Sequence, residues 1–68
     1  MNSSSVEMVE CPCCGNRTIS VFGDYEICPI CLWEDDPAQF KKPNMERGAN
    51  EPSLNQAREL WFSSLQRK

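Results

Sequence analysis

Two short stretches decide the fold of this chain: CPCCG at residues 11–15 and CPIC at residues 28–31. Each contains a C-x2-C pair, and thirteen residues separate Cys14 from Cys28. A tight turn at each pair brings its two sulfurs to one side of the chain, and a β-hairpin between the pairs carries both turns to the same end. Four thiolates can then surround one metal ion tetrahedrally. The spacing therefore predicts a zinc-ribbon-like fold.

The predicted metal ligands share an i, i+3 spacing within each pair, and they are Cys11, Cys14, Cys28 and Cys31. Cys13 could replace Cys14 as a ligand, but only Cys14 gives the first pair the spacing of the second. Cys13 is then the surplus thiol. We expect it to be a small packed or half-exposed residue of the turn, with a reactive or regulatory thiol as the alternative.

The residue types restrict the chemistry. No histidine is present, so a zinc site must use sulfur or carboxylate ligands, and catalysis by a histidine base is excluded. A tetrahedral site of four sulfurs selects zinc or iron. We predict one Zn²⁺ ion, because zinc needs no assembly machinery, and keep iron as the alternative. Four protein ligands leave no position for a reactive water, so the chain is predicted not to be an enzyme.

The short length of the chain means that a bound metal would add needed stability. A chain of 68 residues buries little apolar surface and needs a disulfide, a metal or a partner for stability. Residues 1–5 are predicted to be a disordered N-terminus, and residues 6–68 a single domain. The sequence shows neither a membrane-spanning apolar run nor a secretory signal, so a cytoplasmic protein is expected. Disulfides are rare in the cytosol and five cysteines is an odd number, which favours metal ligation.

Prolines and a glycine support tight turns at both cysteine pairs. Pro12 and Pro29 follow the first cysteine of each pair and preset φ for a turn. Gly15 follows the first pair and can adopt a positive φ, whereas Leu32 stands at the equivalent position after the second pair. We therefore expect the two turns to end differently.

The segment between the pairs carries strand signals. Residues 18–22 are mostly β-branched or aromatic, and Gly23-Asp24 is a turn signal before a second extended segment. This pattern predicts a β-hairpin over residues 18–27. A weak alternation at residues 6–10 predicts a short preceding strand.

A long loop and one helix are predicted for the rest of the chain. Residues 35–52 carry three prolines and several polar residues, and Phe40 is expected to anchor this loop to the core. Ser53 as N-cap and Gln56 as its capping-box partner predict an amphipathic helix over residues 54–66. Its apolar stripe consists of Leu54, Ala57, Trp61 and Leu65, with Phe62 beside it. The stripe is predicted to cover one face of the hairpin or, alternatively, to bind a partner.

Charge is unevenly distributed. The acidic run Glu34-Asp35-Asp36 is predicted to be a solvated loop, with a cation site or an acidic docking patch as alternatives, and Trp33 is expected in the core. Residues 1–36 hold seven acids and one base, whereas residues 37–68 hold three acids and six bases. The formal net charge is −3; four thiolates add −4 and Zn²⁺ adds +2, giving about −5. This balance disfavours nucleic-acid binding.

Several motifs form a familiar combination: CPCCG at 11–15, YEICPICLWEDD at 25–36, GAN at 48–50, and SL at 53–54 leading to AR at 57–58. Together they resemble the bacterial CPCC family of small cysteine-rich proteins over about residues 9–62. The resemblance implies a compact, metal-binding bacterial domain, and it implies no particular biochemical activity.

These features together predict a small α+β domain stabilised by a metal. They predict a monomeric, non-enzymatic zinc-binding module in which the metal is structural and which interacts with an unidentified protein. The main alternative is a rubredoxin-like iron electron carrier, which also uses C-x2-C turns with proline and glycine in a small acidic protein. The short spacer between the pairs suits a ribbon better. A nucleic-acid-binding zinc ribbon is the second alternative, and no membrane association is expected.

Overall fold

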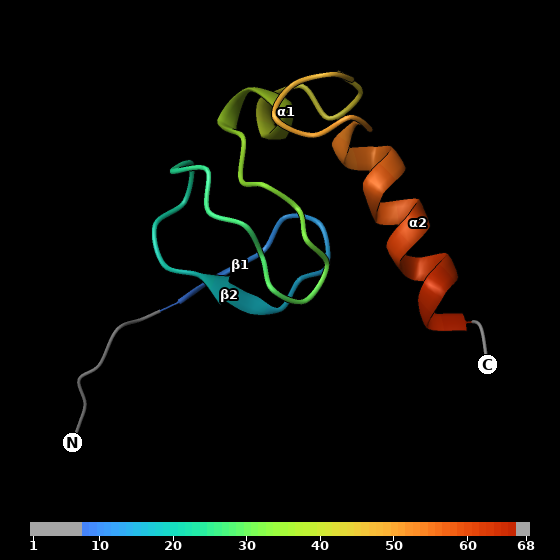
Figure 1. Ribbon diagram of the computed structural model, residues 1–68, viewed down its shortest axis with the longest axis horizontal. Coiled ribbons are helices and arrows are strands. Elements are labelled where there is room, and N and C mark those ends of the chain that lie inside the picture. The colour runs from blue at the N-terminus through green and yellow to red at the C-terminus, as the bar shows by residue number, and fades with distance from the viewer. Residues whose placement is uncertain (1–7, 67–68) are drawn as a thin grey trace.

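The computed structural model describes residues 8–66 (Figure 1). Its elements, in chain order, are β1 (Val9–Glu10), β2 (Arg17–Ile19), α1 (Pro37–Lys41) and α2 (Leu54–Gln66). The predicted disordered segment, residues 1–5, lies outside the described residues. A small α+β domain with an antiparallel hairpin, a C-terminal helix and clustered cysteines was predicted, and this fold class is confirmed. Within residues 8–66, no helix has the length and apolar character needed to cross a membrane.

The β-hairpin does not lie where the sequence predicted it. Strands β1 and β2 pair antiparallel, with Val9 opposite Ile19, so the turn of this hairpin is the first cysteine pair itself. The predicted hairpin over residues 18–27 is therefore wrong. Of the strand predicted at residues 6–10, residues 9–10 form β1, and residues 6–7 lie outside the described residues. The second pair sits in its own turn, closed by an isolated antiparallel bridge from Ile27 to Glu34.

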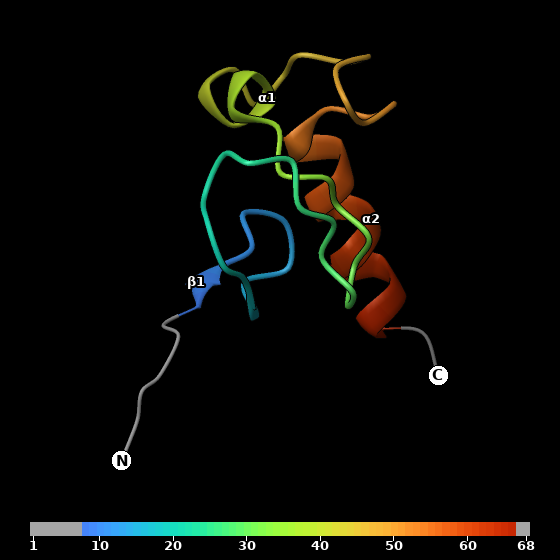
Figure 2. The same ribbon diagram turned by 60° about the vertical axis from the view of Figure 1, so that its left-hand side comes forward.

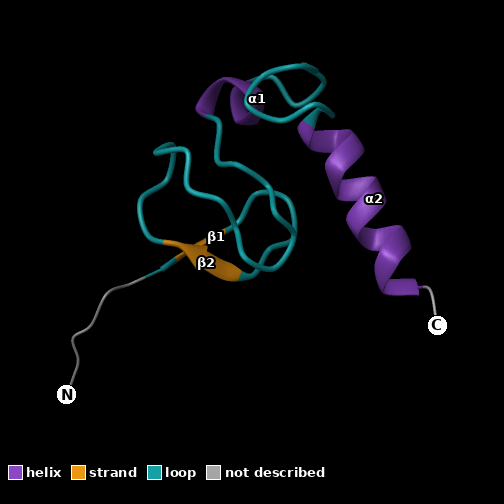
Figure 3. Cartoon of the chain, in the orientation of Figure 1, coloured by secondary structure: helices purple, strands orange, loops and turns teal. Residues whose placement is uncertain are grey.

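A carboxylate explains why β2 ends early. The side chain of Glu26 accepts hydrogen bonds from the backbone N–H groups of Ser20 and Val21, both at 3.0 Å. These two amides would otherwise be available to a neighbouring strand. Gly23 then adopts φ +83°, and the chain turns away. The strand-forming residues after Ile19 thus lie in a loop, and Figure 3 shows loop from the end of β2 to the start of α1.

A short helix interrupts the predicted long loop. Asp36 caps α1 by accepting a hydrogen bond from the Ala38 N–H at 2.8 Å, and Pro37 occupies the first helical turn. Phe40, the predicted core anchor, is 44% exposed and packs edge-to-face on Phe22 with ring centroids 4.7 Å apart. That prediction is wrong because successive helical residues point about 100° apart, and the preceding residue takes the inward position.

Gln39 is that inward residue, and it is fully buried. Its Nε2 donates to the carbonyl oxygens of Met45, Asn50 and Pro52 at 2.9, 3.1 and 3.0 Å. Its Oε1 accepts from the backbone N–H and from the side-chain amide of Asn50. One side chain thus satisfies backbone groups along the loop between the helices, and the loop is held by polar contacts rather than by an aromatic anchor.

The capping box of α2 is present as predicted. The Ser53 hydroxyl accepts from the Gln56 N–H at 3.1 Å, and the Gln56 side chain accepts from the Ser53 N–H at 2.9 Å. The first part of the predicted stripe covers the core: Leu54 is 1% exposed, and Ala57 and Trp61 pack against the core residues. Beyond this point the stripe prediction fails, because Leu65 is exposed.

The core is small and contains cysteines. Its buried apolar residues are Cys11, Cys13, Ile19, Cys28, Trp33 and Leu54. Trp33 is 3% exposed, so its predicted place in the core is confirmed. Helix α2 runs beside the turn of the second cysteine pair, as the rotated view shows (Figure 2). Half of these core residues are therefore cysteines, and the core is continuous with the cysteine cluster.

Candidate metal centre

Four sulfur atoms meet between the two cysteine turns. The Sγ atoms of Cys11, Cys14, Cys28 and Cys31 all lie within 4.8 Å of one another. The contacts that join the two turns are Cys11 to Cys31 at 3.6 Å and Cys14 to Cys28 at 3.7 Å. A tetrahedral ion with metal–sulfur bonds of about 2.3 Å requires sulfurs about 3.8 Å apart. The four predicted ligands thus fit a tetrahedral metal ion such as zinc.

The two cysteine turns, here called knuckle 1 (residues 11–16) and knuckle 2 (residues 28–33), have matching hydrogen bonds. In knuckle 1 the Gly15 N–H donates to the first cysteine carbonyl at 2.9 Å; in knuckle 2 the Leu32 N–H does so at 2.8 Å. The N–H of the first cysteine then donates to the carbonyl oxygen five residues later, at 2.8 Å in knuckle 1 and 2.9 Å in knuckle 2. The sulfur ligands therefore come from two equivalent turns.

This equivalence corrects the expectation that the turns end differently. Gly15 has φ +83° and Leu32 has φ +70°, so both occupy the left-handed region. For a residue with a side chain this conformation costs roughly 1–2 kcal/mol. The hydrogen bonds of the knuckle require a positive φ at this position, whether the residue is glycine or leucine. Leucine thus adopts a conformation that its local preference disfavours.

Side-chain and backbone groups donate hydrogen bonds to the sulfurs. The Thr18 hydroxyl donates to Cys28 Sγ at 3.0 Å, and the Ile30 N–H approaches the same sulfur at 3.4 Å. The Asn16 side-chain amide donates to Cys14 Sγ at 3.3 Å. Donors of this kind stabilise the thiolate form and orient ligands around a metal. The sequence prediction missed Thr18 and Asn16, because only the fold shows which sulfur each faces.

The thiols have unequal acidity. Burial alone would raise the pKa of Cys28, but hydrogen bonds from the Thr18 hydroxyl and from backbone N–H groups outweigh it and lower this pKa to about 6. Burial raises the pKa of Cys31 to about 12 and raises that of Cys11 further. Without a metal, one thiolate therefore forms readily while buried neighbours resist ionisation. A divalent cation supplies the positive charge that lets the remaining thiols ionise.

Cys13 is not part of the cluster of four. It is 6% exposed and lies in the core, and burial raises the pKa of its thiol. Its position agrees with the predicted packed residue of the turn. A reactive thiol would instead be expected to be accessible and more acidic than usual.

The acidic run is not the solvated loop that the sequence predicted. Asp35 is fully buried and accepts a hydrogen bond from the Gly23 N–H. Asp36 is 5% exposed, and hydrogen bonds from the backbone N–H groups of Ala49 and Ala38 hold its pKa below the usual value, although burial opposes this shift. Both carboxylates thus position loop backbone, and only Glu34 is partly accessible.

Fold and site together define a small cysteine-rich domain with two equivalent knuckles and a cluster of four thiols suited to a metal ion. A sequence model of the family described as Cysteine-rich CPCC matches residues 9–64. The chain therefore belongs to the CPCC family of cysteine-rich proteins. No curated protein matches the chain.

Proposed function

We propose that this protein is a non-enzymatic module in which one Zn²⁺ ion, bound by four cysteines, holds the fold together so that its surface can bind another protein. The observation that carries the proposal is the meeting of four thiols within 4.8 Å of one another. The proposed ligands are Cys11, Cys14, Cys28 and Cys31. They fill a tetrahedral shell, which leaves no coordination position for substrate or water.

The position of the ion supports a structural role. Two sulfur contacts, at 3.6 and 3.7 Å, each join a cysteine of knuckle 1 to a cysteine of knuckle 2. The ion therefore connects two halves of the chain that share only a small core. Structural zinc contributes roughly 10–16 kcal/mol of apparent binding energy, which equals or exceeds the roughly 5–15 kcal/mol that stabilises a typical domain. Free thiols and this metal suit a reducing compartment such as the cytoplasm.

Metal analysis combined with substitution tests the proposal. The purified protein should be colourless and contain one zinc per chain, and a chelator should abolish its near-ultraviolet tryptophan signal. Cys28→Ser should lose zinc and unfold, because one of four ligands is removed from a fully buried position. Cys13→Ser, a thiol-to-hydroxyl change outside the cluster, is the matched control and should retain zinc. A chain that stays folded and keeps its melting temperature without metal would contradict the structural role.

A rubredoxin-like electron carrier is a second candidate, favoured by the equivalence of the two knuckles. Matching turns with a backbone N–H directed at Cys28 Sγ would also suit an iron centre, whose potential depends on hydrogen bonds to sulfur. Sulfur spacing does not separate the two ions. A red protein that contains iron and shows a reversible one-electron couple would support this candidate, and a colourless zinc protein without a couple would reject it.

A further inference from the structure

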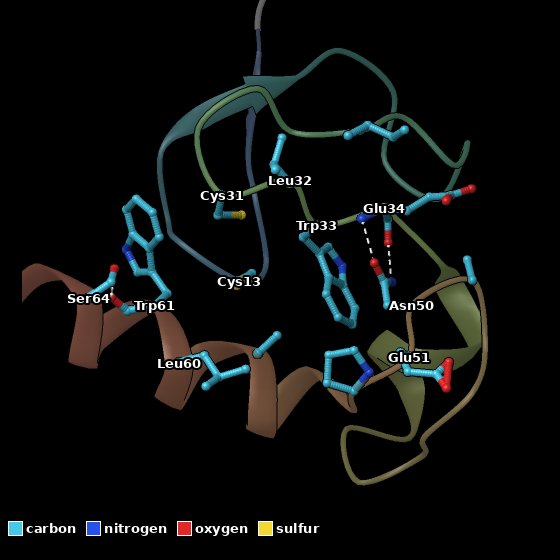
Figure 4. Close-up of a pocket in the computed structure, with 14 residues that line it drawn as sticks. Cys13, Cys31, Leu32, Trp33, Glu34, Asn50, Glu51, Leu60, Trp61 and Ser64 are labelled. Atoms are coloured by element: carbon cyan, nitrogen blue, oxygen red, sulfur yellow. Dashed lines mark hydrogen bonds between the residues drawn. The ribbon is translucent and has the colours of Figure 1, made fainter.

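A groove opens between α2 and knuckle 2, and it is here called the α2 groove. Its volume is about 520 Å³, within the range of sites that bind small ligands or a few side chains of a peptide. The lining residues that carry the argument are Ile27, Leu32, Glu34, Glu51, Leu60 and Trp61. Figure 4 shows Leu60 and Trp61 on the helix and Cys31 and Leu32 on the ribbon of the knuckle.

The rim of this groove is unusually apolar. Leu32, Leu60 and Ile27 are 71%, 65% and 60% exposed, the highest values among the large apolar side chains of residues 8–66. They come from two separate parts of the chain, since Ile27 and Leu32 lie just before and in knuckle 2 and Leu60 lies in α2, yet all three line this one groove. Apolar side chains gathered at a hollow, rather than scattered singly, are typical of an interaction site.

Leu32 is also held in a disfavoured backbone conformation. Its φ of +70° is one that glycine adopts freely, as Gly15 does at the equivalent place in knuckle 1. The leucine side chain is the most exposed of its kind and therefore adds little to the core. The knuckle requires the positive φ but no side chain at this position, so an exposed leucine in place of glycine is readily explained by a contact with another molecule.

The charged residues that line the groove are all acidic. Glu34 and Glu51 are the charged residues among its lining, and both are acidic. Within residues 8–66, neither carboxylate accepts a hydrogen bond or forms an ion pair. Asn50 holds the backbone of Glu34 in place by two hydrogen bonds, at 2.9 and 2.8 Å (Figure 4). The rim thus presents acidic side chains beside exposed apolar ones.

We propose that the α2 groove binds a short segment of a partner protein in which an apolar side chain stands next to lysine or arginine. The apolar side chain packs between Leu32 and Leu60, and the cation reaches Glu34 or Glu51. The stem of a basic side chain can also lie on the face of Trp61. This inference rests on the proposed function, since knuckle 2 forms one wall and its Cys31 is a proposed zinc ligand.

A heptapeptide library on beads, screened with the fluorescently labelled, zinc-loaded protein, tests the inference. The selected peptides should be enriched in an apolar residue adjacent to lysine or arginine and depleted in acidic residues, and their binding should weaken as salt is added. The best of these peptides should shift the indole N–H signals of Trp33 and Trp61 in a heteronuclear NMR spectrum. Absence of enrichment, or selection of acidic peptides, would overturn the inference.

Two matched variants of α2 locate the binding. Leu60→Ser should lower the affinity for the selected peptide at least tenfold, whereas Phe62→Ser should change it less than twofold. Both residues are exposed on the same helix, but Phe62 lines a different hollow, beside Phe22 and Phe40. Equal losses from both variants, or a loss confined to Phe62→Ser, would overturn the assignment to the α2 groove.

The metal content of the same samples separates the two proposals. A folded, zinc-loaded protein that selects no peptide would remove the α2 groove inference and leave the structural zinc in place. A protein that selects basic apolar peptides equally well without any metal would support the groove and refute the structural role of zinc.

Discussion

Replacing Thr18 by valine should weaken zinc binding about 10- to 100-fold. The Thr18 hydroxyl donates to Cys28 Sγ at 3.0 Å, and Cys28 is fully buried, so no water can replace the lost donor. A hydrogen bond to a charged group contributes about 1.5–3 kcal/mol, and each 1.4 kcal/mol corresponds to about a tenfold change in affinity. Valine has the same shape and suits strand β2, so the loss should reflect the hydroxyl alone.

The same substitution should make metal binding more sensitive to acid. The Thr18 hydroxyl helps to lower the pKa of Cys28 to about 6, so its removal should raise this pKa. Protons and metal compete for the thiolate, and a higher pKa favours the proton. At fixed zinc and chelator concentrations, the pH at which half of the protein is metal-loaded should therefore move upward.

Competition with a chromophoric chelator at constant pH measures the affinity ratio. Thr18→Ser keeps the hydroxyl and is the control; it should bind zinc within about threefold of the unchanged protein. The reasoning would be refuted by a valine variant that binds zinc as tightly as the unchanged protein. A serine variant that loses as much affinity as the valine variant would refute it too, because the loss would then come from packing of the methyl group.

Three further substitutions test other parts of the structure. Gln39→Glu removes the two amide hydrogens shared among three carbonyl oxygens and should lower the free energy of unfolding, measured in urea, by about 2–6 kcal/mol. Asn44→Asp makes the same charge change at an exposed position and should alter this free energy by no more than about 0.5 kcal/mol. Leu32→Gly relieves the left-handed strain, so stability should be unchanged or higher by up to about 1 kcal/mol, while peptide binding falls; a clear loss of stability would contradict the account of the knuckle. Gly48→Ala should lower the melting temperature by several degrees, because the new Cβ would lie 2.6 Å from Asp36 Oδ2; an unchanged melting temperature would show that this loop yields easily.

The cysteine cluster could be predicted from the sequence because it depends on local spacing. Two C-x2-C turns of the same length place their sulfurs alike wherever the intervening chain goes. For the same reason Cys14 joins the cluster and Cys13 does not. The capping box at Ser53 and Gln56 is equally local, since both of its hydrogen bonds span three residues.

Two predictions failed because carboxylates compete for backbone N–H groups. Residues 18–22 have strand propensity, but the Glu26 carboxylate takes the amides that a partner strand would need. The run Glu34-Asp35-Asp36 is hydrophilic, yet both of its aspartates are buried. They accept hydrogen bonds from backbone N–H groups in loops on either side in sequence, Asp35 from Gly23 and Asp36 from Ala49. Propensity and hydropathy describe a residue alone and cannot identify these partners.

The sequence by itself determined the number and identity of the proposed ligands, the fold class and the position of the C-terminal helix, because each follows from contacts a few residues apart. Tertiary structure alone decided that Thr18 faces Cys28 and that exposed apolar residues from knuckle 2 and α2 share one groove. Those features arise where segments far apart in sequence meet. The physical reason is that hydrogen-bond donors, charges and apolar surfaces interact with the groups that the fold places beside them.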